Sequence, residues 1–411
     1  MGKPKIRFKG YADDWEQRKL GEMVIDHNAG IYISKEDYGE GTNVIGVGNI
    51  YDRDIFDGEI YRLGPVNDDK FILEENDIIY GESSLVPEGI ARTVCVGKNG
   101  AGSAFAWHTR RVKLDKNIVN SHVATLELNY LHEIRKYLVS VSTQTALTGM
   151  TTEGYFGATL TLPSVEEQQV ISDYFKNLDH LITLHQRKCD ETKKLKKYML
   201  QKMFPQNGEK VPKIRFAGFS DDWEQRKLSE LLYLSNEKND GSYTRDDVLA
   251  ASLGTELQKK HIYFGLRATD ESVKNYKVVL PKDVIYTKSP IKGFPNGIIR
   301  TNKGETGIVP TLYCVYHSID TINPSIIQAY FESKERLDAY LVPLVNIGAR
   351  NNVNITDKEF INGSICIPKN VTEQNRIVDL LEKISNLITL HQQKCDELQN
   401  IKKFMLKNMF A

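Results

Sequence analysis

The chain has 411 residues, with 54 basic and 54 acidic side chains, 40% hydrophobic residues and 26% charged residues. At roughly 100 to 200 residues per domain this length predicts two or three domains, and the composition excludes a disordered, collagen-like or fibrous protein. Because the net charge is zero, affinity for nucleic acid must come from local clusters of basic residues.

Targeting and cysteine signals are absent from the sequence. No run approaches the roughly 18 consecutive apolar residues that a membrane-spanning helix needs, and residues 1–10 have no apolar stretch typical of a signal peptide. The five cysteines are an odd number without C-x-x-C spacing, which argues against a disulfide framework and a structural zinc site. We therefore expect a cytoplasmic protein with free thiols and no contact with a membrane.

An internal repeat organises the chain. Residues 4–20 and 212–228 are identical at fourteen of seventeen positions, and residues 181–204 and 387–410 are identical at sixteen of twenty-four. Between these matched ends the two copies diverge. A duplicated framework with unlike middles suits a protein that does the same job on two different targets.

The two middles predict an α+β fold with many loops. Short strands are expected at residues 44–47, 77–80, 278–280 and 312–316, and short helices at residues 130–140 and 326–341. Two fragments align between the copies, residues 77–80 with 283–286 and residues 89–93 with 297–301. Loops on such a framework are available to carry function.

Each copy ends in a long predicted helix. Ser164 with Glu167, and Asn370 with Glu373, have the spacing of a capping box directly after a proline. Apolar and small residues then recur at alternating steps of three and four, which is a heptad pattern. The seam positions are Ile171, Tyr174, Leu178, Leu181, His185, Lys188, Thr192, Leu195 and Met199, and Ile377, Leu380, Ile384, Leu387, His391, Lys394, Leu398, Ile401 and Met405.

Two matched helices of about 60 Å each are longer than their own domains need, so we expect them to pack on each other. The linker at residues 205–211 spans at most about 25 Å, which places the second domain near the far end of the first helix. The pair is therefore expected to be antiparallel. The predicted boundaries are a first domain at 1–163, a helix at 164–204, the linker at 205–211, a second domain at 212–368 and a helix at 369–411.

Known catalytic and ligand motifs are missing from the sequence. There is no adenine methyltransferase motif and no cluster of nuclease carboxylates, and residues 97–103 lack the lysine that a phosphate-binding loop requires. His185 and His391 occupy equivalent seam positions, where a polar residue that fixes register is favoured over a metal ligand. Cys189 and Cys395 are expected to be small interior residues. We expect no catalysis by the chain itself.

The W-E-Q-R-K-L motif that opens each copy, the strand ending in Leu162-Pro163 or Ile367-Pro368, the Glu-Gln pair after it and the long helix resemble the specificity subunit of type I restriction-modification enzymes. The resemblance covers the whole chain. It implies two target recognition domains that each read one half of a split site in double-stranded DNA, joined by helices that set the spacer and dock partner subunits.

The resemblance also implies the partners and their cofactors. Two modification subunits would methylate adenine with S-adenosylmethionine, and restriction subunits would use ATP and Mg²⁺. The chain itself is expected to bind no cofactor and no metal.

Candidate DNA-binding residues combine cations for phosphates with guanidinium, amide and hydroxyl groups for base edges. They are Ser83, Ser84, Arg92, Lys98, Arg110, Arg111, Thr148, Thr151 and Thr152 in the first domain, and Lys288, Lys292, Arg300, Lys303, Arg350, Asn351 and Asn352 in the second. Candidate partner-binding residues on the helices are Leu178, Leu181, His185, Leu195, Met199, Ile384, Leu387, His391, Leu398 and Met405.

Each candidate has a structural interpretation beside the functional one. Arg92 and Arg300 align between domains of different content, which favours a structural or phosphate-contacting role over base reading. Trp15 and Trp223 belong to the repeated motif and are expected to pack in the framework or contact a partner. Two other functional classes stay open, a stand-alone DNA enzyme and a coiled-coil structural protein of the bacteriophage type.

Overall fold

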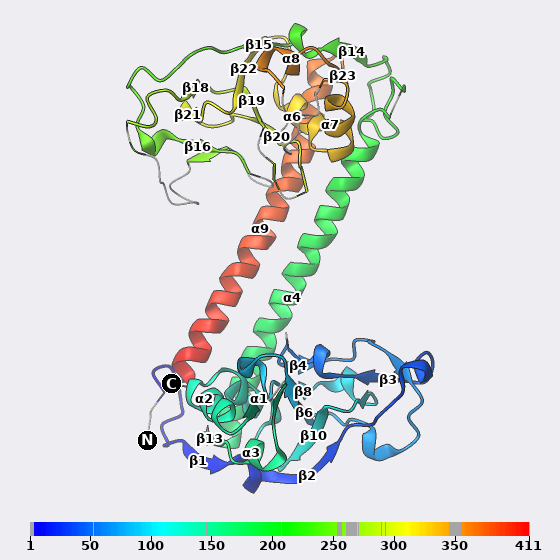
Figure 1. The fold of residues 1–411 in the computed structure, drawn as a ribbon, viewed down its shortest axis with the longest axis vertical. Helices are drawn as coiled ribbons and strands as arrows, with labels where there is room; N and C mark the ends of the chain where they lie inside the picture. Colours follow the sequence, from blue (N-terminus) through cyan, green and yellow to red (C-terminus); the bar gives the residue numbers. More distant parts are fainter. Residues whose placement is uncertain are drawn as a thin grey trace. The chain divides into compact units, whose positions relative to one another are not determined.

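The computed structural model describes residues 4–51, 53–144, 147–206, 208–252, 257–259, 269, 271–288, 290–291, 293–344 and 355–410. The chain divides into two compact units, unit 1 with Met1–Thr183 and Cys395–Ala411, and unit 2 with Leu184–Lys394. Each unit contains part of both long helices, whereas the predicted boundaries treated the helices as separate segments (Figure 1).

Unit 1 is built around a five-stranded sheet in the order β2-β10-β6-β8-β4. Its strands are β1 (Glu16–Lys19), β2 (Val24–Ala29), β3 (Thr42–Ile45), β4 (Ile55–Phe56), β5 (Leu63–Gly64), β6 (Ile78–Gly81), β7 (Ser83–Ser84), β8 (Thr93–Val96), β9 (Ala104–Phe105), β10 (Thr109–Leu114), β11 (Thr143–Gln144), β12 (Thr148–Gly149) and β13 (Thr159–Leu162). Every residue of β6 is buried, because the apolar run Ile78-Ile79-Tyr80 is covered on both faces of the sheet.

Three short helices belong to the same unit: α1 (Ser121–Tyr130), α2 (His132–Ser140) and α3 (Thr152–Phe156). The Asn120 side chain caps α1 by accepting the backbone N–H groups of His122 and Val123. Figure 1 shows α1 and α2 on one side of the sheet, beside the start of α4 and the end of α9. Residues of α1, β6, β13 and both long helices form one core cluster, and Ile79, Val94 and Phe105 belong to a second.

Unit 2 repeats this plan with a four-stranded antiparallel sheet in the order β15-β22-β19-β20. Its elements are β14 (Glu224–Lys227), β15 (Leu232–Leu234), β16 (Leu249–Ala250), β17 (Gln258–Lys259), β18 (Lys277–Val279), β19 (Val284–Thr287), β20 (Ile298–Thr301), β21 (Gly307–Val309), β22 (Cys314–Ser318), β23 (Ser364–Ile367), α6 (Ser325–Phe331), α7 (Lys334–Leu341) and α8 (Asp357–Phe360). The pairing of β1 with β13 in unit 1 recurs as the pairing of β14 with β23.

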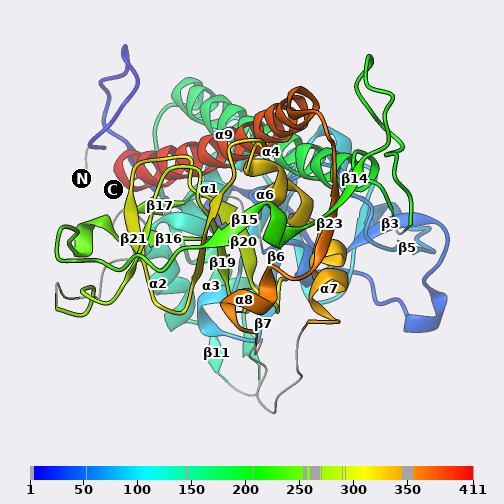
Figure 2. The same cartoon turned by 90° about the horizontal axis from the view of Figure 1, so that it is seen from above.

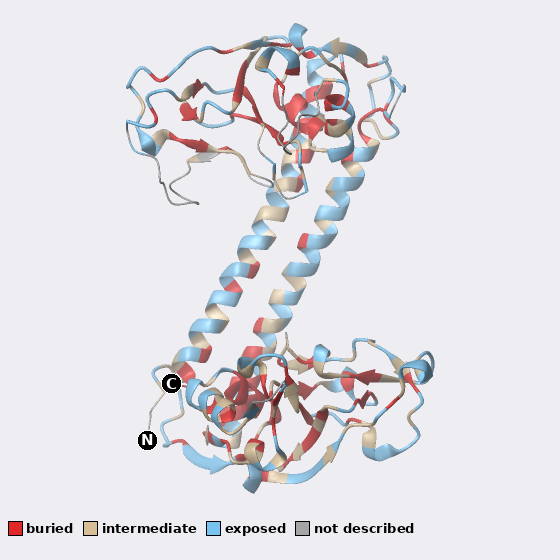
Figure 3. Cartoon of the chain, in the orientation of Figure 1, coloured by how far each residue is buried: buried red, intermediate tan, exposed pale blue. Residues whose placement is uncertain are grey.

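The long helices are α4 (Val165–Lys202) and α9 (Val371–Met409). In unit 1 the start of α4 shares a core cluster with the end of α9, through Phe175 and Met409 among others. In unit 2 the end of α4 shares a core cluster with the start of α9, through Leu200 and Ile377. The helices are therefore antiparallel in each unit, which confirms the predicted α+β fold with an antiparallel helix pair. Figure 3 shows their buried positions beside otherwise exposed surface.

The predicted heptad seam is wrong at several positions. Leu181, Leu195 and Leu387 are 40%, 45% and 48% exposed. Cys189 and Cys395 are almost fully buried instead, as expected for small interior residues. The reason is that an α-helix has 3.6 residues per turn, so a strict 3.5-residue pattern drifts away from the contact line along a straight helix.

The equivalent histidines of the two helices meet inside unit 2. The Nδ1 atoms of His185 and His391 lie 3.1 Å apart, so one ring donates a hydrogen bond to the other. A hydrogen bond between the two rings requires at least one of them to be neutral at that nitrogen. The pair matches the expected role of a polar residue that fixes the register of the helices.

The Glu-Gln pair after each proline holds each unit together. Glu167 accepts two hydrogen bonds from the Arg7 guanidinium, at 2.8 and 2.7 Å, and Glu373 accepts two from Arg215, at 2.7 and 2.9 Å. All four carboxylate and amide side chains of the two pairs are buried. The repeated K-I-R-F motif is thus tied to the start of each long helix by a bidentate ion pair.

The adjacent glutamines make a second matched set of bonds. Gln168 accepts the backbone N–H of Asn120 at 2.7 Å and donates to the carbonyl of Pro163 at 2.9 Å. Gln374 accepts the N–H of Asn323 at 2.9 Å and donates to the carbonyl of Pro368 at 2.8 Å. Each glutamine therefore joins the long helix to the segment that begins α1 or α6.

Some predicted elements are displaced in the structure. The helix expected at residues 130–140 begins at His132, and the buried helix α1 before it was not predicted. The helix expected at residues 326–341 is two helices, because α6 ends at Phe331 and Ser333 caps α7. The alignment of Arg92 with Arg300 does not hold in the sheets, since Arg92 lies before β8 and Arg300 lies within β20.

We predict that Glu167→Gln destabilises unit 1 by roughly 3 kcal/mol, because it leaves the Arg7 charge without its buried anion. Hydrogen exchange resolved by residue measures this as lost protection in residues 4–183. Glu373→Gln should do the same in unit 2, and the exposed Glu166→Gln should leave both units unchanged. Equal loss in both units from Glu167→Gln would contradict the assignment of the pair to unit 1.

The end of the chain lies beside its beginning within unit 1. The backbone N–H of Ile6 donates to the carbonyl of Asn408 at 3.1 Å, and in unit 2 the N–H of Ile214 donates to the carbonyl of Lys202 at 2.9 Å. The rings of Trp15 and Phe410 are 6.0 Å apart, and those of Trp223 and Phe204 are 5.8 Å apart. The junction between the two copies is thus equivalent to the open ends of the chain.

A circular permutant should therefore fold. Joining residue 411 to residue 1 through a second copy of the segment at 205–211, and opening the chain between Phe204 and Pro212, cuts no helix. We expect a denaturation midpoint close to that of the parent chain. A permutant opened inside α4 at Lys188 is the control and should lose stability, and failure of the first permutant to fold would contradict the equivalence.

Candidate nucleic-acid interface

A small polar sheet projects from unit 1. It has the strand order β11-β12-β7, with Thr148 opposite Ser84 and Gly149 opposite Ser83. In Figure 2 β7 and β11 lie at the edge of the unit away from α4. The structure thus brings together three of the predicted residues. The side chains of Ser84 and Thr148 are buried, so these residues hold the small sheet together.

Arg110 lies at the base of this sheet. Its Nε donates to Glu82 Oε1 at 2.7 Å, and Glu82 in turn accepts the backbone N–H of Met150 through its carbonyl at 2.9 Å. The guanidinium is partly exposed, with a side-chain exposure of 19%. A carboxylate that fixes one edge of a guanidinium leaves the other donors oriented, which suits recognition of a guanine edge.

Two other predicted arginines of unit 1 are engaged inside the protein. Arg92 donates to Asp54 at 3.2 Å and to the Tyr130 hydroxyl at 3.0 Å. Arg111 is 5% exposed and forms an ion pair with Asp26 at 2.5 Å. Their geometry favours a role in the framework over contact with DNA.

Asp54 is the centre of this internal network. Its carboxylate accepts hydrogen bonds from Arg92, Asn129, Tyr130 and Lys402, all within unit 1. Burial acts to raise the pKa of Asp54, but the charges of Lys402 and Arg92 outweigh it and lower the pKa below its usual value. The network therefore keeps a charged carboxylate beside the edge strand β4 and ties the end of α9 to it.

The remaining predicted residues of unit 1 lie on loops and caps. Lys98 is exposed, next to the turn that follows β8. Thr151 caps α3 by accepting the backbone N–H of Gly154 at 3.0 Å, and Thr152 is the first residue of that helix. Of these three residues, only the lysine presents a charge to solvent.

In unit 2 the described candidates have partners within the protein. Lys288 forms an ion pair with Asp357 at 2.9 Å, and Lys303 forms one with Glu382 at 2.7 Å. Arg300 is 4% exposed and donates two hydrogen bonds to the carbonyl of Ser252. The predicted residues Lys292, Arg350, Asn351 and Asn352 lie outside the described part of the chain.

An exposed aromatic cluster in unit 1 was not predicted. Trp107 and Tyr32 are 51% and 67% exposed, with ring centroids 5.3 Å apart, and the His108 ring lies 3.8 Å from that of Trp107. His108 has a φ of 66°, in the left-handed region that a non-glycine residue adopts rarely. In the sequence this cluster is visible only as a Trp-His pair between two short strands, at Trp107 and His108.

A basic cluster in unit 2 was also missed. Lys193, Lys196 and Lys197 of α4, together with Arg300 and Lys334, line a pocket of about 360 Å³. Lys196 pairs with Glu332 at 2.7 Å, which offsets part of this charge. These lysines belong to the K-K-x-K-K run at residues 193–197, which lies in a helix predicted only to pack against its partner helix.

The predicted partner-binding residues divide by exposure. Leu178, Ile384 and Leu398 are buried, Met199 and Met405 pack against core clusters, and His185 bonds to His391. Leu181, Leu195 and Leu387 are exposed and remain available for contact with another protein. Exposed apolar side chains on the same helices also include Tyr198, Leu390 and Phe404.

Within the described residues no group of three or more His, Cys, Asp or Glu side chains could hold a metal ion. Among the same residues, no helix has both the length and the apolar character to cross a bilayer. All five cysteines are free thiols.

The chain is thus a duplicated protein of two similar α+β units, each with an Arg-Glu pair at the start of a long helix. Residues 12–194 match the family described as type I restriction modification DNA specificity domain. The chain is therefore similar to specificity subunits of type I restriction-modification systems, and the family match covers somewhat less than half of its length.

Relatives and a solved structure agree with this. The chain is 21% identical to the "Putative type I restriction enzyme MjaX specificity subunit" of Methanocaldococcus jannaschii, over 95% of this chain and 91% of the relative. It is 25% identical to the type I restriction enzyme MjaVIII specificity subunit of the same organism, over 44% of this chain and 41% of the relative. The crystal structure of a type I restriction-modification system S subunit from M. genitalium has the same fold, with a TM-score of 0.61, 12% identity and coverage of 100% of this chain and 99% of the other.

Arg110 and Lys98 should contribute to DNA binding in different ways. We predict that Arg110→Lys in the assembled complex costs roughly 1 to 3 kcal/mol on the cognate site and relaxes the preference at one base, because it loses the fork of donors. Lys98→Ala should weaken binding to all sequences alike and reduce the salt slope by about one. Titrations of cognate and altered duplexes at several salt concentrations measure both. The same salt slope and sequence preference in both variants would contradict the distinction.

Proposed function

We propose that each unit reads one half of a bipartite, asymmetric DNA site and that the two long helices set the length of the unread spacer. The observation that carries the proposal is that the two units share their framework bonds but differ in their sheet edges and loops. The Arg-Glu and Gln bonds recur in both units, whereas the sheet edges and loops that would face DNA differ. Equal frameworks with different loops supply two specificities in one chain.

In this proposal unit 1 contacts DNA through Ser83 at the edge of the β11-β12-β7 sheet, Arg110 and the Trp107 cluster. Arg110 is oriented by Glu82, and the exposed aromatic rings offer apolar surface to base edges or methyl groups. In unit 2 the lysines of α4 at 193–197 supply cations for phosphates. The zero net charge of the chain makes such local clusters the source of affinity.

The proposed partners are two modification subunits and the restriction subunits of a type I complex. The exposed side chains of Leu181, Leu195 and Leu387 provide apolar contact surface on the helices. The complex would methylate adenine and cleave DNA, with S-adenosylmethionine, ATP and Mg²⁺ bound by the partner subunits. Contact with double-stranded DNA through both units would then direct the methylation.

Exchange of the variable part of unit 1 tests the proposal. Replacing residues 26–150 with the matching region of another specificity subunit should change one half of the methylated sequence and leave the other half and the spacer as before. Mapping of methylated adenines in cells that carry the modification subunit measures this. A change in both halves, or methylation of the original site, would contradict the proposal.

The control for this exchange is the matching exchange in unit 2. Replacing the region between β14 and β23 should change only the other half of the site. The β1-β13 and β14-β23 pairs and the Arg-Glu bonds lie outside the exchanged segments, so both chimaeras retain them.

A further inference from the structure

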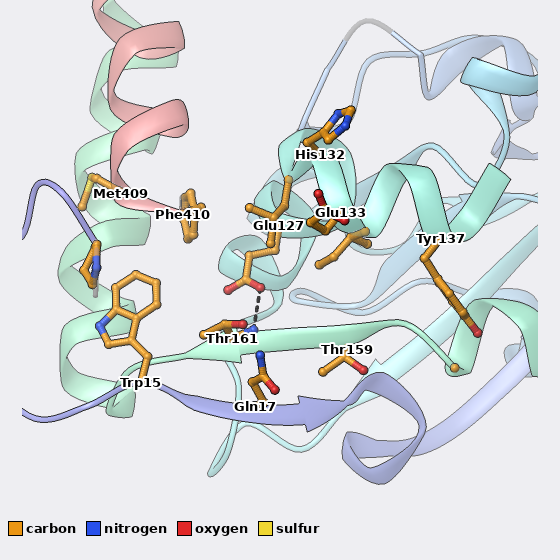
Figure 4. Close-up of a pocket in the computed structure, with 14 residues that line it drawn as sticks. Trp15, Gln17, Glu127, His132, Glu133, Tyr137, Thr159, Thr161, Met409 and Phe410 are labelled. Carbon is orange, nitrogen blue, oxygen red and sulfur yellow. Dashed lines mark hydrogen bonds between the residues drawn. The ribbon is translucent and has the colours of Figure 1, made fainter. Parts of the chain in front are cut away.

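Unit 1 contains a pocket of about 590 Å³ that has no part in the DNA-reading surface described above. It lies between the β1-β13 ribbon, the helices α1 and α2, and the last residues of the chain (Figure 4). The rings of Trp15 and Phe410 line one side, and Glu127 and Glu133 line the other. The pocket is thus aromatic on one side and acidic on the other.

Glu127 is the buried polar group of this pocket. Its side chain is fully buried, and its Oε2 accepts the backbone N–H of Thr161 at 2.8 Å. Its Oε1 has no hydrogen-bond partner among the described residues. Burial raises the pKa of Glu127 to about 8. A buried carboxyl oxygen without a partner is costly to a fold, which points to a ligand that supplies the missing donor.

The second unit shows what stands at the matching place. Asn120 before α1 and Asn323 before α6 make the same bonds to the Glu-Gln pairs, so Glu127 corresponds to Tyr330, seven residues after each asparagine. The buried residues Ile134 and Leu138 of α2 correspond to Leu337 and Leu341 of α7. Glu133 and Arg336, which directly precede the first of these pairs, therefore correspond as well.

In unit 2 the matching place is filled by Arg336. Its guanidinium carbon lies 4.5 Å from the centre of the Phe204 ring and 5.2 Å from that of Tyr330. Its nitrogens donate to the carbonyls of Leu200 and Tyr330, each at 2.7 Å. Phe204 corresponds to Phe410, since each packs edge-on against the tryptophan of the repeated motif.

We infer that the pocket of unit 1 binds an arginine side chain of a protein partner, with its guanidinium over Phe410 and bonded to Glu127. In unit 2 the matching place already holds an arginine of the chain itself, Arg336. Unit 1 has the same aromatic wall, but two glutamates replace the tyrosine and the arginine, so it has the anion and lacks the cation. A guanidinium supplies several donors and stacks on aromatic rings, which matches both walls.

The occupant is a protein and not DNA, because phosphates would meet two carboxyl groups. The pocket is also lined by Trp15 of the repeated motif and by Met409 and Phe410, and no residue of the β11-β12-β7 sheet lines it. Under the proposed function, on which this step rests, the partner that contacts the framework is the modification subunit. Since unit 2 fills its own cradle, the two copies of that subunit would dock on the chain differently.

The first test uses N-acetylarginine amide as the probe and the full chain. The indole N–H of Trp15, which has no hydrogen-bond partner among the described residues, reports binding in an ¹⁵N-labelled sample. We expect saturable binding that weakens at least tenfold in Glu127→Gln and is lost in Glu133→Arg. The second variant gives unit 1 an arginine at the position where unit 2 has Arg336. Glu166→Gln, exposed on α4, is the control and should bind as the parent chain does.

Dependence on pH gives a second readout. Binding should strengthen as the pH rises from about 6.5 to 8.5, because the cation selects the ionised form of Glu127, whose pKa is about 8. The other titratable groups that line the pocket are His132, Glu133 and Tyr137. Glu127→Gln isolates the contribution of Glu127 and should flatten the profile.

Three results would overturn the inference. No saturable binding of the probe, equal binding of N-acetyllysine amide, or equal binding to Glu133→Arg would each exclude an arginine pocket.

The assembly test addresses the partner separately. Glu127→Gln and Glu133→Arg should weaken assembly with the modification subunit at least tenfold, while Glu166→Gln should not. Probe binding without any effect on assembly would exclude the modification subunit as the source of the arginine. If the parent chain does not assemble with that subunit at all, the proposed function fails, and the probe experiment still decides whether the pocket binds arginine.

Discussion

The buried bond between an arginine near the start of each copy and a glutamate at the start of each long helix is the constraint on which the fold depends. Arg7 with Glu167, and Arg215 with Glu373, join segments about 160 residues apart in sequence. Removing one partner from such a pair leaves an uncompensated charge, so each bond holds the start of its copy against the start of its long helix. The neighbouring glutamines bond to the residues that begin α1 and α6, and so join these helices to the long ones.

This arrangement separates stability from specificity. The matched bonds lie in the framework, where the two copies remain nearly identical, and the sheet edges and loops are free to differ. Asp54 adds to these bonds in unit 1, because its carboxylate accepts hydrogen bonds from both Arg92 and Lys402 of α9. Changes in the loops therefore cost little stability, which is the condition for two recognition surfaces to diverge after duplication.

Differences between the copies are informative where the framework itself changes. The cradle beside the repeated tryptophan holds Arg336 in unit 2, and the matching positions in unit 1 are Glu127 and Glu133. One buried carboxyl oxygen of Glu127 has no partner among the described residues, and the inferred arginine of another protein would supply the missing donor. The two framework surfaces consequently offer different chemistry to a partner despite their common fold.

Near-identical ends, a short linker and long periodic segments are local patterns, so they were enough to predict the duplication, the α+β class, the antiparallel helices and the resemblance to type I specificity subunits. Which side chains reach solvent, in contrast, depends on the tertiary fold. Arg92, Arg111 and Arg300 looked like surface cations, but their guanidinium groups bond inside the units. Leu181 and Leu195 fit a heptad but lie exposed, since the helices do not follow a 3.5-residue repeat. Exposure and the pairing of distant charges depend on how segments far apart in sequence pack, which periodicity and spacing do not contain.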